Sequence, residues 1–338
     1  GQYGADIAPY FQWWDTNLDN HSEIDRQAWE AAVVAALGDE HLEELRGIVG
    51  VLEPYGISWN SLVLFQAMYE MGSPLIACSQ ILAAARDGTV LHARNLDYRV
   101  ISPLIEITFS RGGRVSHIAP TYLGNTGVHT VIKPGYWSAA VNARLDLEYD
   151  DVEMVLGRLV GGVGLCMLGL RRLAEGDASY SEALSGLQTM ALARSIYFVI
   201  AGPGPYEGAV VTHLAEKATR LAQLSEQTPE MPEDAHGWFL LQTNDDLDKS
   251  PWDDRRDAGI NSMVAVTQEN VSPKLLLEVM LKPPLYMKLN NILFMMTPRA
   301  GLFCSIMGPS IRDDDRSISD RCLLRGWDST DPPGAGGT

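Results

Sequence analysis

The segment that most constrains this chain begins at Cys78. An apolar stretch runs from Cys78 to an Asp87-Gly88 turn, and a second stretch carries Arg94 and Asp97 near its end. Two apolar stretches joined by an Asp-Gly turn are typical of a β-hairpin. In such a hairpin Arg94 and Asp97 return towards Cys78. A thiol, a guanidinium and a carboxylate in one small volume favour a cysteine that attacks a carbonyl carbon.

Length and charge set broad limits on what the chain can be. Its 338 residues suffice for one large domain or two ordinary ones, and a hydrophobic fraction of 46% allows a substantial core. The formal net charge is -17 and the isoelectric point is about 4.8. Because such a chain repels phosphates, nucleic acid is not expected as a partner. The seven histidines lack the spacing of metal ligands, so neither a metal nor another cofactor is expected.

The cysteines and the glycosylation motifs bear on the compartment. Four cysteines are too few for a disulfide scaffold. If Cys78 is a nucleophile, at most one intramolecular pair remains, and proximity in sequence favours Cys304 with Cys322. Asn20 and Asn270 begin sequences that fit the glycosylation motif, although such matches also arise by chance. No signal peptide is visible at the N-terminus, which leaves open a mature form or a chain without a leader.

The longest apolar stretch of the sequence is Leu159–Leu170. Its 12 residues are well short of the ~20 that span a bilayer, so no transmembrane helix is expected. We interpret the stretch as a core helix. A helix that touches lipid or lines a substrate site is the alternative.

The order of the predicted elements indicates the fold class. Residues 1–77 are mainly helical in pattern, short alternating strands with glycine turns follow Cys78, and residues 151–194 return to helix. Runs of strands with helices in separate blocks favour a layered α+β architecture over a doubly wound sheet. The expected helices are Ala28–Leu52, Leu62–Tyr69 and one beginning at Leu275–Met280; the expected strands are Leu104–Ser110, Val115–Pro120, Trp137–Val141, Ile196–Ala201, Ala209–Thr212, Trp238–Gln242 and Leu302–Met307.

Four segments in a fixed order carry a resemblance to a known family. They are Arg94–Tyr98, Gly124–Arg144, Glu207–Thr212, and Gln242–Asn244 with the following Trp252–Arg256. In this order and spacing they resemble the acid ceramidase and N-acylethanolamine acid amidase family, over about residues 50 to 325. The family is related more distantly to bile-salt hydrolases and penicillin V acylase. The resemblance implies an αββα N-terminal nucleophile hydrolase fold, with two stacked antiparallel sheets between helical layers.

The resemblance also implies how the chain is activated. The precursor is expected to cleave itself between Ala77 and Cys78, giving an α-subunit of residues 1–77 and a β-subunit of residues 78–338 that stay together as one unit. Cys78 then carries both a thiol and a free α-amine, which titrates near ~7.7–8.0 in isolation and can act as the base. The thiolate attacks the substrate amide, an acyl-enzyme forms, and water releases the fatty acid.

Each further site residue receives a role from the resemblance. Asp97 is expected to orient the α-amine, Arg94 to favour the thiolate, and Asn244 to donate to the oxyanion. Arg255 is similar to a family arginine that shapes the site. Each also has a plain structural reading: an Arg94–Asp97 ion pair, a turn capped by Asn244, and Arg255 in a solvated run of charges. The resemblance further suggests Asn142 and Glu207 as substrate-binding residues.

Two positions depart from the family pattern and affect the expected substrate. Ala143 stands where the family often has an acidic residue, and Asp245 stands where it often has tyrosine. The resemblance therefore implies a lysosomal or extracellular hydrolase of an amphipathic fatty-acyl amide, with contact to a membrane surface. The two departures indicate an altered recognition of the leaving amine. A small-amide acylase of the bile-salt or penicillin V type, and a non-catalytic protein that kept the fold, are the alternatives.

Overall fold

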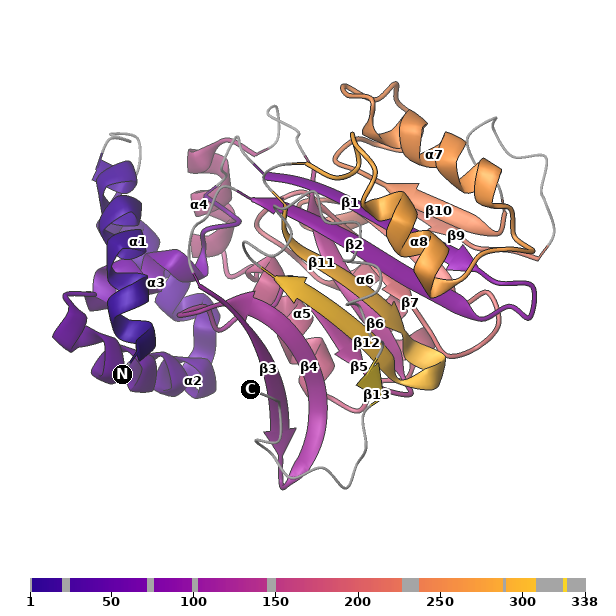
Figure 1. Cartoon of the computed structure of the whole chain (residues 1–338). Helices are drawn as coiled ribbons and strands as arrows, with labels where there is room; N and C mark the ends of the chain where they lie inside the picture. The colour runs from indigo at the N-terminus through magenta and orange to yellow at the C-terminus, as the bar shows by residue number, and fades with distance from the viewer. Residues whose placement is uncertain are drawn as a thin grey trace.

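Two antiparallel sheets stacked face to face form the centre of the molecule (Figure 1). The computed structural model describes residues 2–19, 25–71, 76–98, 103–144, 150–226, 237–287, 290–307 and 325–326. Within this part of the chain, helices cover the outer face of each sheet. The layers therefore follow the order helix, sheet, sheet, helix, which confirms the predicted αββα architecture.

The first sheet contains the hairpin that the sequence predicts. Its strand order is β10-β1-β2-β11-β12-β13. Gly88 turns the hairpin with a φ of +78°, and a Cβ at this position would lie 2.6 Å from Cβ of Pro205. Glycine is therefore required there both by backbone conformation and by space. The strands of this sheet are β1 (Ile76–Ala84), β2 (Val90–Tyr98), β10 (Phe239–Gln242), β11 (Asn290–Thr297), β12 (Leu302–Met307) and β13 (Arg325–Gly326).

The second sheet follows the chain almost strand by strand, in the order β3-β4-β5-β6-β7-β8-β9. Its central strands are apolar on both faces, because one face packs on the first sheet and the other packs on helices. Every residue of β7, for example, is buried. The strands are β3 (Leu104–Arg111), β4 (Arg114–Tyr122), β5 (Thr130–Lys133), β6 (Trp137–Ala143), β7 (Ile196–Ala201), β8 (Gly208–Leu214) and β9 (Lys217–Gln223).

The helices form three groups around the sheets. Helices α7 and α8 pack on the outer face of the first sheet, whereas α5 and α6 pack on the outer face of the second. Helices α1 to α3 lie together beside α4, at one end of the sheets (Figure 1). The helices are α1 (Gln2–Asp19), α2 (Arg26–Leu52), α3 (Trp59–Gln66), α4 (Val152–Val160), α5 (Cys166–Glu175), α6 (Tyr180–Thr189), α7 (Arg255–Val266) and α8 (Pro273–Met280), with short 3₁₀ turns η1 (Glu53–Tyr55) and η2 (Pro298–Ala300).

Side-chain caps explain where several helices begin. Asp25 accepts hydrogen bonds from two backbone N–H groups at the start of α2, and Ser58 accepts one at the start of α3. Ser179 and Glu182 form a capping box at the start of α6. Each cap satisfies N–H groups that have no partner inside the helix.

The interpretation of Leu159–Leu170 as one helix is wrong. Helix α4 ends at Val160, the Gly161-Gly162 pair breaks the chain direction with a φ of +92° at Gly162, and α5 begins only at Cys166. The side chains of Leu165 and Leu168 are buried, whereas Val160 is 69% exposed. Among the described residues, no helix is long and apolar enough to cross a bilayer.

The described residues also include some of the tryptophans and cysteines. Trp14 is buried, whereas its neighbour Trp13 is 44% exposed. Cys304 is disulfide-bonded, and Cys78 and Cys166 are free thiols. The predicted partner Cys322 and the glycosylation motif at Asn20 lie outside the described residues.

Candidate active site

Strand alternation places Cys78 and Arg94 on the face of the hairpin that meets the second sheet. Cys78 is paired in register with Leu96, and Arg94 is paired with Gln80. Since residues two apart on a strand share a face, Cys78 and Arg94 become neighbours. The Nη2 of Arg94 lies 3.7 Å from Sγ of Cys78. Both side chains are fully buried.

The second sheet fixes the Arg94 guanidinium. Its Nη1 donates to the carbonyl oxygen of His129 at 2.7 Å and to Oγ1 of Thr130, and its Nη2 donates to the carbonyl oxygen of Val141 at 2.5 Å. These acceptors are neutral, so they hold the cation in place without neutralising it. The positive charge stays available to the sulfur.

Asp97 lies on the opposite face of the same hairpin. It is paired with Ala77, and on that face Asn95 donates to carbonyl groups beside α8. The Asp97 carboxylate is buried and accepts no hydrogen bond from the described residues. Burial raises its pKa to about 8, although the cations of Arg255 and Arg94 act against the shift. The carboxyl group beside the Ala77–Cys78 peptide is therefore mostly neutral below that pH.

Asn244 and Arg255 hold the backbone of Cys78. The backbone N–H of Cys78 donates to Oδ1 of Asn244 at 2.9 Å. Arg255 donates to the same Oδ1 from Nη2 at 2.9 Å, and to the carbonyl oxygen of Cys78 from Nη1 at 2.8 Å. Although Arg255 belongs to a run of charges, its side chain is only 1% exposed and its Nε is paired with Asp253 at 2.8 Å. The reading of this arginine as part of a solvated face is wrong.

The amide of Asn244 has a defined orientation. Its Oδ1 accepts from two donors at Cys78 and Arg255, and its Nδ2 donates to the carbonyl oxygen of Ala143 at 2.8 Å. One of the two N–H bonds of Nδ2 remains for another acceptor. The expected role of Asn244 as an oxyanion donor stays a prediction that depends on this second N–H.

Asn142 braces the strand that leads to Asn244. Its Nδ2 donates to the carbonyl oxygens of Gln242 and Thr243 at 3.0 Å each, and its Oδ1 accepts from Gln80 at 2.6 Å. The side chain is fully buried in this network between the two sheets. These contacts position the site; the expected contact with substrate stays a prediction.

Glu207 is not part of the group of residues around Cys78. It accepts a hydrogen bond from the backbone N–H of Gly204 at 2.7 Å, and the neighbouring Tyr206 donates to the carbonyl oxygen of Gly88. Gly88 is the turn of the hairpin, at the opposite end of β1 from Cys78. The position does not support the expected contact between Glu207 and a substrate held at the sulfur.

Sequence reasoning missed two groups of residues near the site. Tyr69, which precedes the predicted cleavage point, has its hydroxyl 4.0 Å from Sγ of Cys78. Arg144 binds Asp246 through two parallel hydrogen bonds of 2.8 Å, just beyond Asn244. Tyr69 ends an apolar run, so its sequence context indicates only a core residue. Arg144 and Asp246 lie about a hundred residues apart, so the sequence does not indicate that they pair. Only the position of Asp246, close to Asn244 in the sequence, could have indicated a residue near the site.

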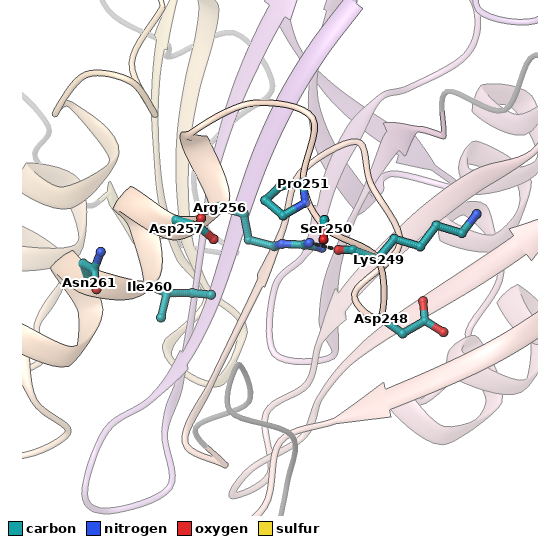
Figure 2. A pocket seen from close by; sticks show the side chains of 8 residues that line it. All are labelled: Asp248, Lys249, Ser250, Pro251, Arg256, Asp257, Ile260 and Asn261. Carbon is teal, nitrogen blue, oxygen red and sulfur yellow. Dashed lines mark hydrogen bonds between the residues drawn. The ribbon is translucent and has the colours of Figure 1, made fainter.

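A polar pocket lies against the loop that joins β10 to α7 (Figure 2). Its volume is about 480 Å³, and charged or amide side chains make up most of its lining. Cys78 does not line it. The pocket is therefore unsuited to an acyl chain, and it lies outside the group of residues around the sulfur. Its lining residues are Asp248, Lys249, Ser250, Pro251, Arg256, Asp257, Ile260 and Asn261.

The chain is similar in sequence to several enzymes of known activity. It is 27% identical to acid ceramidase of Bos taurus over 309 residues, which cover 84% of this chain and 71% of the relative. It is 27% identical to N-acylethanolamine-hydrolyzing acid amidase of Caenorhabditis elegans over 313 residues, which cover 90% and 78%. No family model matches the chain.

The solved structures agree with these relatives. The Caenorhabditis elegans N-acylethanolamine-hydrolyzing acid amidase ortholog superposes with a TM-score of 0.58 at 28% identity, covering 66% of this chain and 93% of that chain. The stacked sheets, with a cysteine near the start of a central strand, define the chain as an N-terminal nucleophile hydrolase by fold. Within that class its sequence is similar to the acid ceramidases and the N-acylethanolamine-hydrolyzing acid amidases.

Proposed function

We propose that this protein hydrolyses the amide bond of a fatty-acyl amide, and that Cys78 is its nucleophile. One observation supports the proposal most: the sulfur and the backbone nitrogen of Cys78 have separate polar partners. Arg94 lies beside the sulfur, and Asn244 accepts from the nitrogen. If both the thiol and the amine of one residue react, each group needs its own polar partner.

Activation begins with cleavage of the Ala77–Cys78 peptide, which lies inside β1. The Cys78 sulfur attacks the carbonyl carbon of Ala77, the carbon–nitrogen bond breaks, and the peptide becomes a thioester as the nitrogen leaves with a proton. The neutral Asp97 carboxyl, which is paired in register with Ala77, is the acid placed to supply that proton. The proton that the thiol loses balances this transfer and restores the neutral carboxyl of the acid. Water then hydrolyses the thioester, which frees the carboxylate of Ala77 and the thiol and amine of Cys78.

Substrate hydrolysis reuses the same groups. The free α-amine takes the proton of the thiol, and the thiolate attacks the amide carbonyl of the substrate. The amine product leaves with a proton and the acyl group stays on the sulfur. Water then releases the fatty acid and restores the thiol. Arg94 stabilises the negative charge near the sulfur, and Asn244 holds the nitrogen and has a second N–H for the oxyanion.

The relatives support a lipid amide as the substrate, since their names give ceramide hydrolysis and N-acylethanolamine hydrolysis. Ala143 is buried and contributes its carbonyl oxygen to Asn244, so it offers no carboxylate to a head group. We therefore propose a fatty-acyl chain on one side of the amide bond and an amine other than that of the relatives on the other side.

A lysosomal or extracellular location fits this function. The disulfide at Cys304 belongs to an oxidising compartment, and an acidic chain loses charge repulsion as pH falls. We also propose contact with a membrane surface, because amphipathic substrates are held there. Within Leu159–Leu170, the segment considered for lipid contact, the side chain of Val160 at the end of α4 is exposed and could reach a membrane surface.

Intact mass spectrometry after incubation at mildly acidic pH tests the activation step. The wild-type protein should yield fragments of residues 1–77 and 78–338, and the Cys78→Ala variant should stay whole and inactive. Cys166→Ala is the matched control, because Cys166 is the other buried free thiol and should not be needed for cleavage. Cleavage of the Cys78→Ala variant at the same bond would refute the proposal.

A substrate panel then tests the activity. Amides of one amine, graded in acyl length, should be hydrolysed faster as the chain lengthens towards that of a long fatty acid. Equal rates across the series would exclude the fatty-acyl specificity and leave an amidase for small amides.

A further inference from the structure

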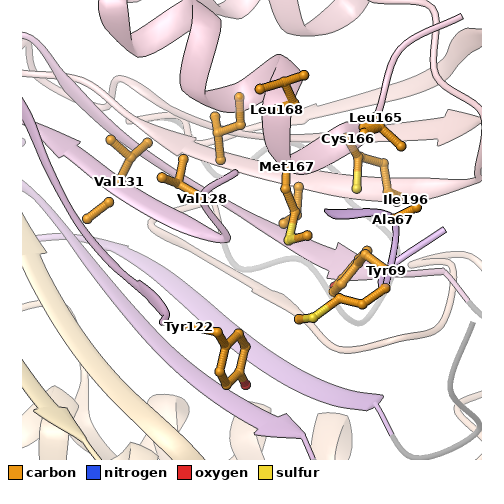
Figure 3. Packing of buried hydrophobic residues seen from close by; sticks show 14 of the residues in the cluster. Ala67, Tyr69, Tyr122, Val128, Val131, Leu165, Cys166, Met167, Leu168 and Ile196 are labelled. Carbon is orange, nitrogen blue, oxygen red and sulfur yellow. The ribbon is translucent and has the colours of Figure 1, made fainter. Parts of the chain in front are cut away.

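Tyr69 lies at the sulfur of Cys78 although it belongs to the segment before the predicted cleavage point. Its side chain is 1% exposed, and its hydroxyl is 4.0 Å from Sγ, within the range of a hydrogen bond to sulfur. In the packed interior Tyr69 lies with Leu165, Cys166 and Ile196, which follow Cys78 in the chain (Figure 3).

The backbone around Tyr69 is held by residues that follow Cys78. Nη1 of Arg194 donates to the carbonyl oxygens of Tyr69 and Glu70, at 3.2 Å and 3.0 Å. The Glu70 carboxylate accepts from the backbone N–H of Cys166 at 2.7 Å, at the first turn of α5. Burial raises the pKa of Glu70, and the hydrogen bond from Cys166 acts against this rise. None of these contacts depends on an intact Ala77–Cys78 peptide.

The ring of Tyr69 is fixed as well. It packs edge to face on His129, with ring centroids 5.4 Å apart and an interplanar angle of 65°. The carbonyl oxygen of His129 is also an acceptor for Arg94. The phenol and the guanidinium therefore reach the sulfur from positions set by the same residue.

The charged and titratable groups around the phenol leave it as a donor. Cys78, Arg94 and Cys166 act on it electrostatically, and His129 contacts its ring. Burial raises the pKa of Tyr69 well above its ordinary value, with the negative form of Cys78 adding to the shift. Burial and Arg94 lower the pKa of His129 well below its usual range, so this imidazole stays neutral. A neutral phenol beside a thiolate donates its hydrogen to the sulfur.

We propose that Tyr69 is a catalytic residue, which donates a hydrogen bond to the Cys78 sulfur while it is a thiolate. The proposal rests on the proposed function, because it takes Cys78 as the nucleophile. Since Tyr69 precedes the cleavage point, the active site is then built from both fragments.

The Tyr69→Phe variant tests the proposal, because it removes the hydroxyl and keeps the ring. In the fully cleaved protein, kcat should fall about 10-fold, the usual effect of one hydrogen bond to a charged group. KM should change little. The acid limb of the pH–rate profile should move to higher pH, because the thiolate has lost a donor. Tyr180→Phe is the matched control: its buried hydroxyl on α6 has no hydrogen-bond partner among the described residues, and its loss should change neither measurement.

The outcomes separate this proposal from the proposed function. An unchanged kcat and pH profile in Tyr69→Phe would overturn the role of the phenol, and so would a loss of activity explained entirely by a smaller folded fraction. Activity in Cys78→Ala would instead overturn the proposed function. Should Tyr69→Phe not fold, 3-fluorotyrosine at position 69 keeps the hydroxyl and strengthens it as a donor. The acid limb should then move to lower pH, and an unmoved limb would overturn the proposal.

Discussion

At the scale of one residue, burial keeps the Asp97 carboxyl protonated in the folded chain at a pH where it is ionised in the unfolded chain. Its pKa is about 8 in the folded state against an ordinary value of 3.8. Between these values the folded protein holds a proton that the unfolded chain releases, so rising pH lowers the free energy of unfolding. The stabilising contribution is complete below about pH 4 and is lost as pH rises through about 8. An acidic compartment therefore favours the folded precursor with its acid in the neutral form.

Replacing Asp97 with asparagine should remove this pH dependence. In the uncleavable Cys78→Ala background, Asp97→Asn should match its parent in stability at pH near 4, since both side chains are neutral there. Above pH 8 it should be more stable than the parent by about 6 kcal/mol, because each pH unit between the two pKa values is worth about 1.4 kcal/mol. Urea unfolding across the pH range measures the difference. Buried histidines such as His92, whose pKa burial lowers to about 3, titrate alike in both proteins and cancel. Equal stability at both ends of the range would contradict the buried-acid reading.

At the scale of elements, the side chain of Asp246 holds the loop between β10 and α7 in place. This carboxylate binds Arg144, and it accepts from the hydroxyl of Tyr197 at 2.8 Å and pairs with Lys249 at 3.0 Å. Burial alone would raise the pKa of Asp246, but the hydrogen bonds from Arg144, Lys249 and Tyr197 outweigh it and hold the pKa well below its ordinary range. The loop is thereby tied to β6 and β7 beside Asn244.

Asp246→Asn should therefore impair the site from a distance. The neutral amide leaves Arg144 with an uncompensated charge, at a cost of about 2 kcal/mol or more in stability. Because Asn244 is two residues away, both self-cleavage and kcat should fall, by about 10-fold, in the fraction that stays folded. Thermal unfolding and single-turnover rates measure the two effects. Asp248→Asn is the control, as that carboxylate is 66% exposed in its pair with Arg220 and should matter little.

The broken segment between α4 and α5 gives a second prediction at this scale. Leu168→Ala should cost about 2–5 kcal/mol, because the side chain is 2% exposed in the core. Val160→Ala should change stability by less than about 0.5 kcal/mol, because that side chain lies mostly in solvent. Chemical denaturation of the two variants measures the contrast. Similar losses would mean that Leu159–Leu170 packs as the single core helix first inferred from the sequence.

These elements also show what the sequence could and could not indicate. Local patterns predicted the β1–β2 hairpin, since its turn residue and its apolar residues are adjacent in the chain. Strand β9 was not predicted, because it lies at a sheet edge where exposed and half-buried residues alternate and none is fully buried. The predicted Leu159–Leu170 helix failed because uniform hydrophobicity masks a glycine break. In the site, the short hairpin allowed the sequence to predict that Arg94 lies near Cys78. The positions of Tyr69 and of the Arg144–Asp246 pair depend on tertiary packing, which no local pattern encodes.

At the scale of the whole molecule, the two sides of the predicted cleavage point share one core. Helices α2 and α3 bury Trp29, Val33 and Phe65 in the same cluster as α5 and the second sheet. Polar contacts cross the same boundary. Gln66 donates to the carbonyl oxygen of Gly124 at 2.8 Å, and several further donors and acceptors link the two sides. These links are Thr126 N–H to Gln66 Oε1, Arg171 to Glu44 at 2.6 Å, and Arg172 to the carbonyl oxygen of Leu37 at 2.6 Å.

The cleaved protein should consequently behave as a tight complex whose unfolding releases two chains. Its fragments should elute together in native size-exclusion chromatography and separate in denaturant. Because unfolding then produces two molecules from one, the Tm of the cleaved protein should rise with protein concentration, while that of uncleaved Cys78→Ala should not. Calorimetry at several concentrations measures both. If the fragment before Cys78 dissociates under native conditions while activity persists, the shared core is not needed for function. If activity is retained only in the associated complex, the buried contacts between the two fragments, rather than the covalent bond, keep the site assembled.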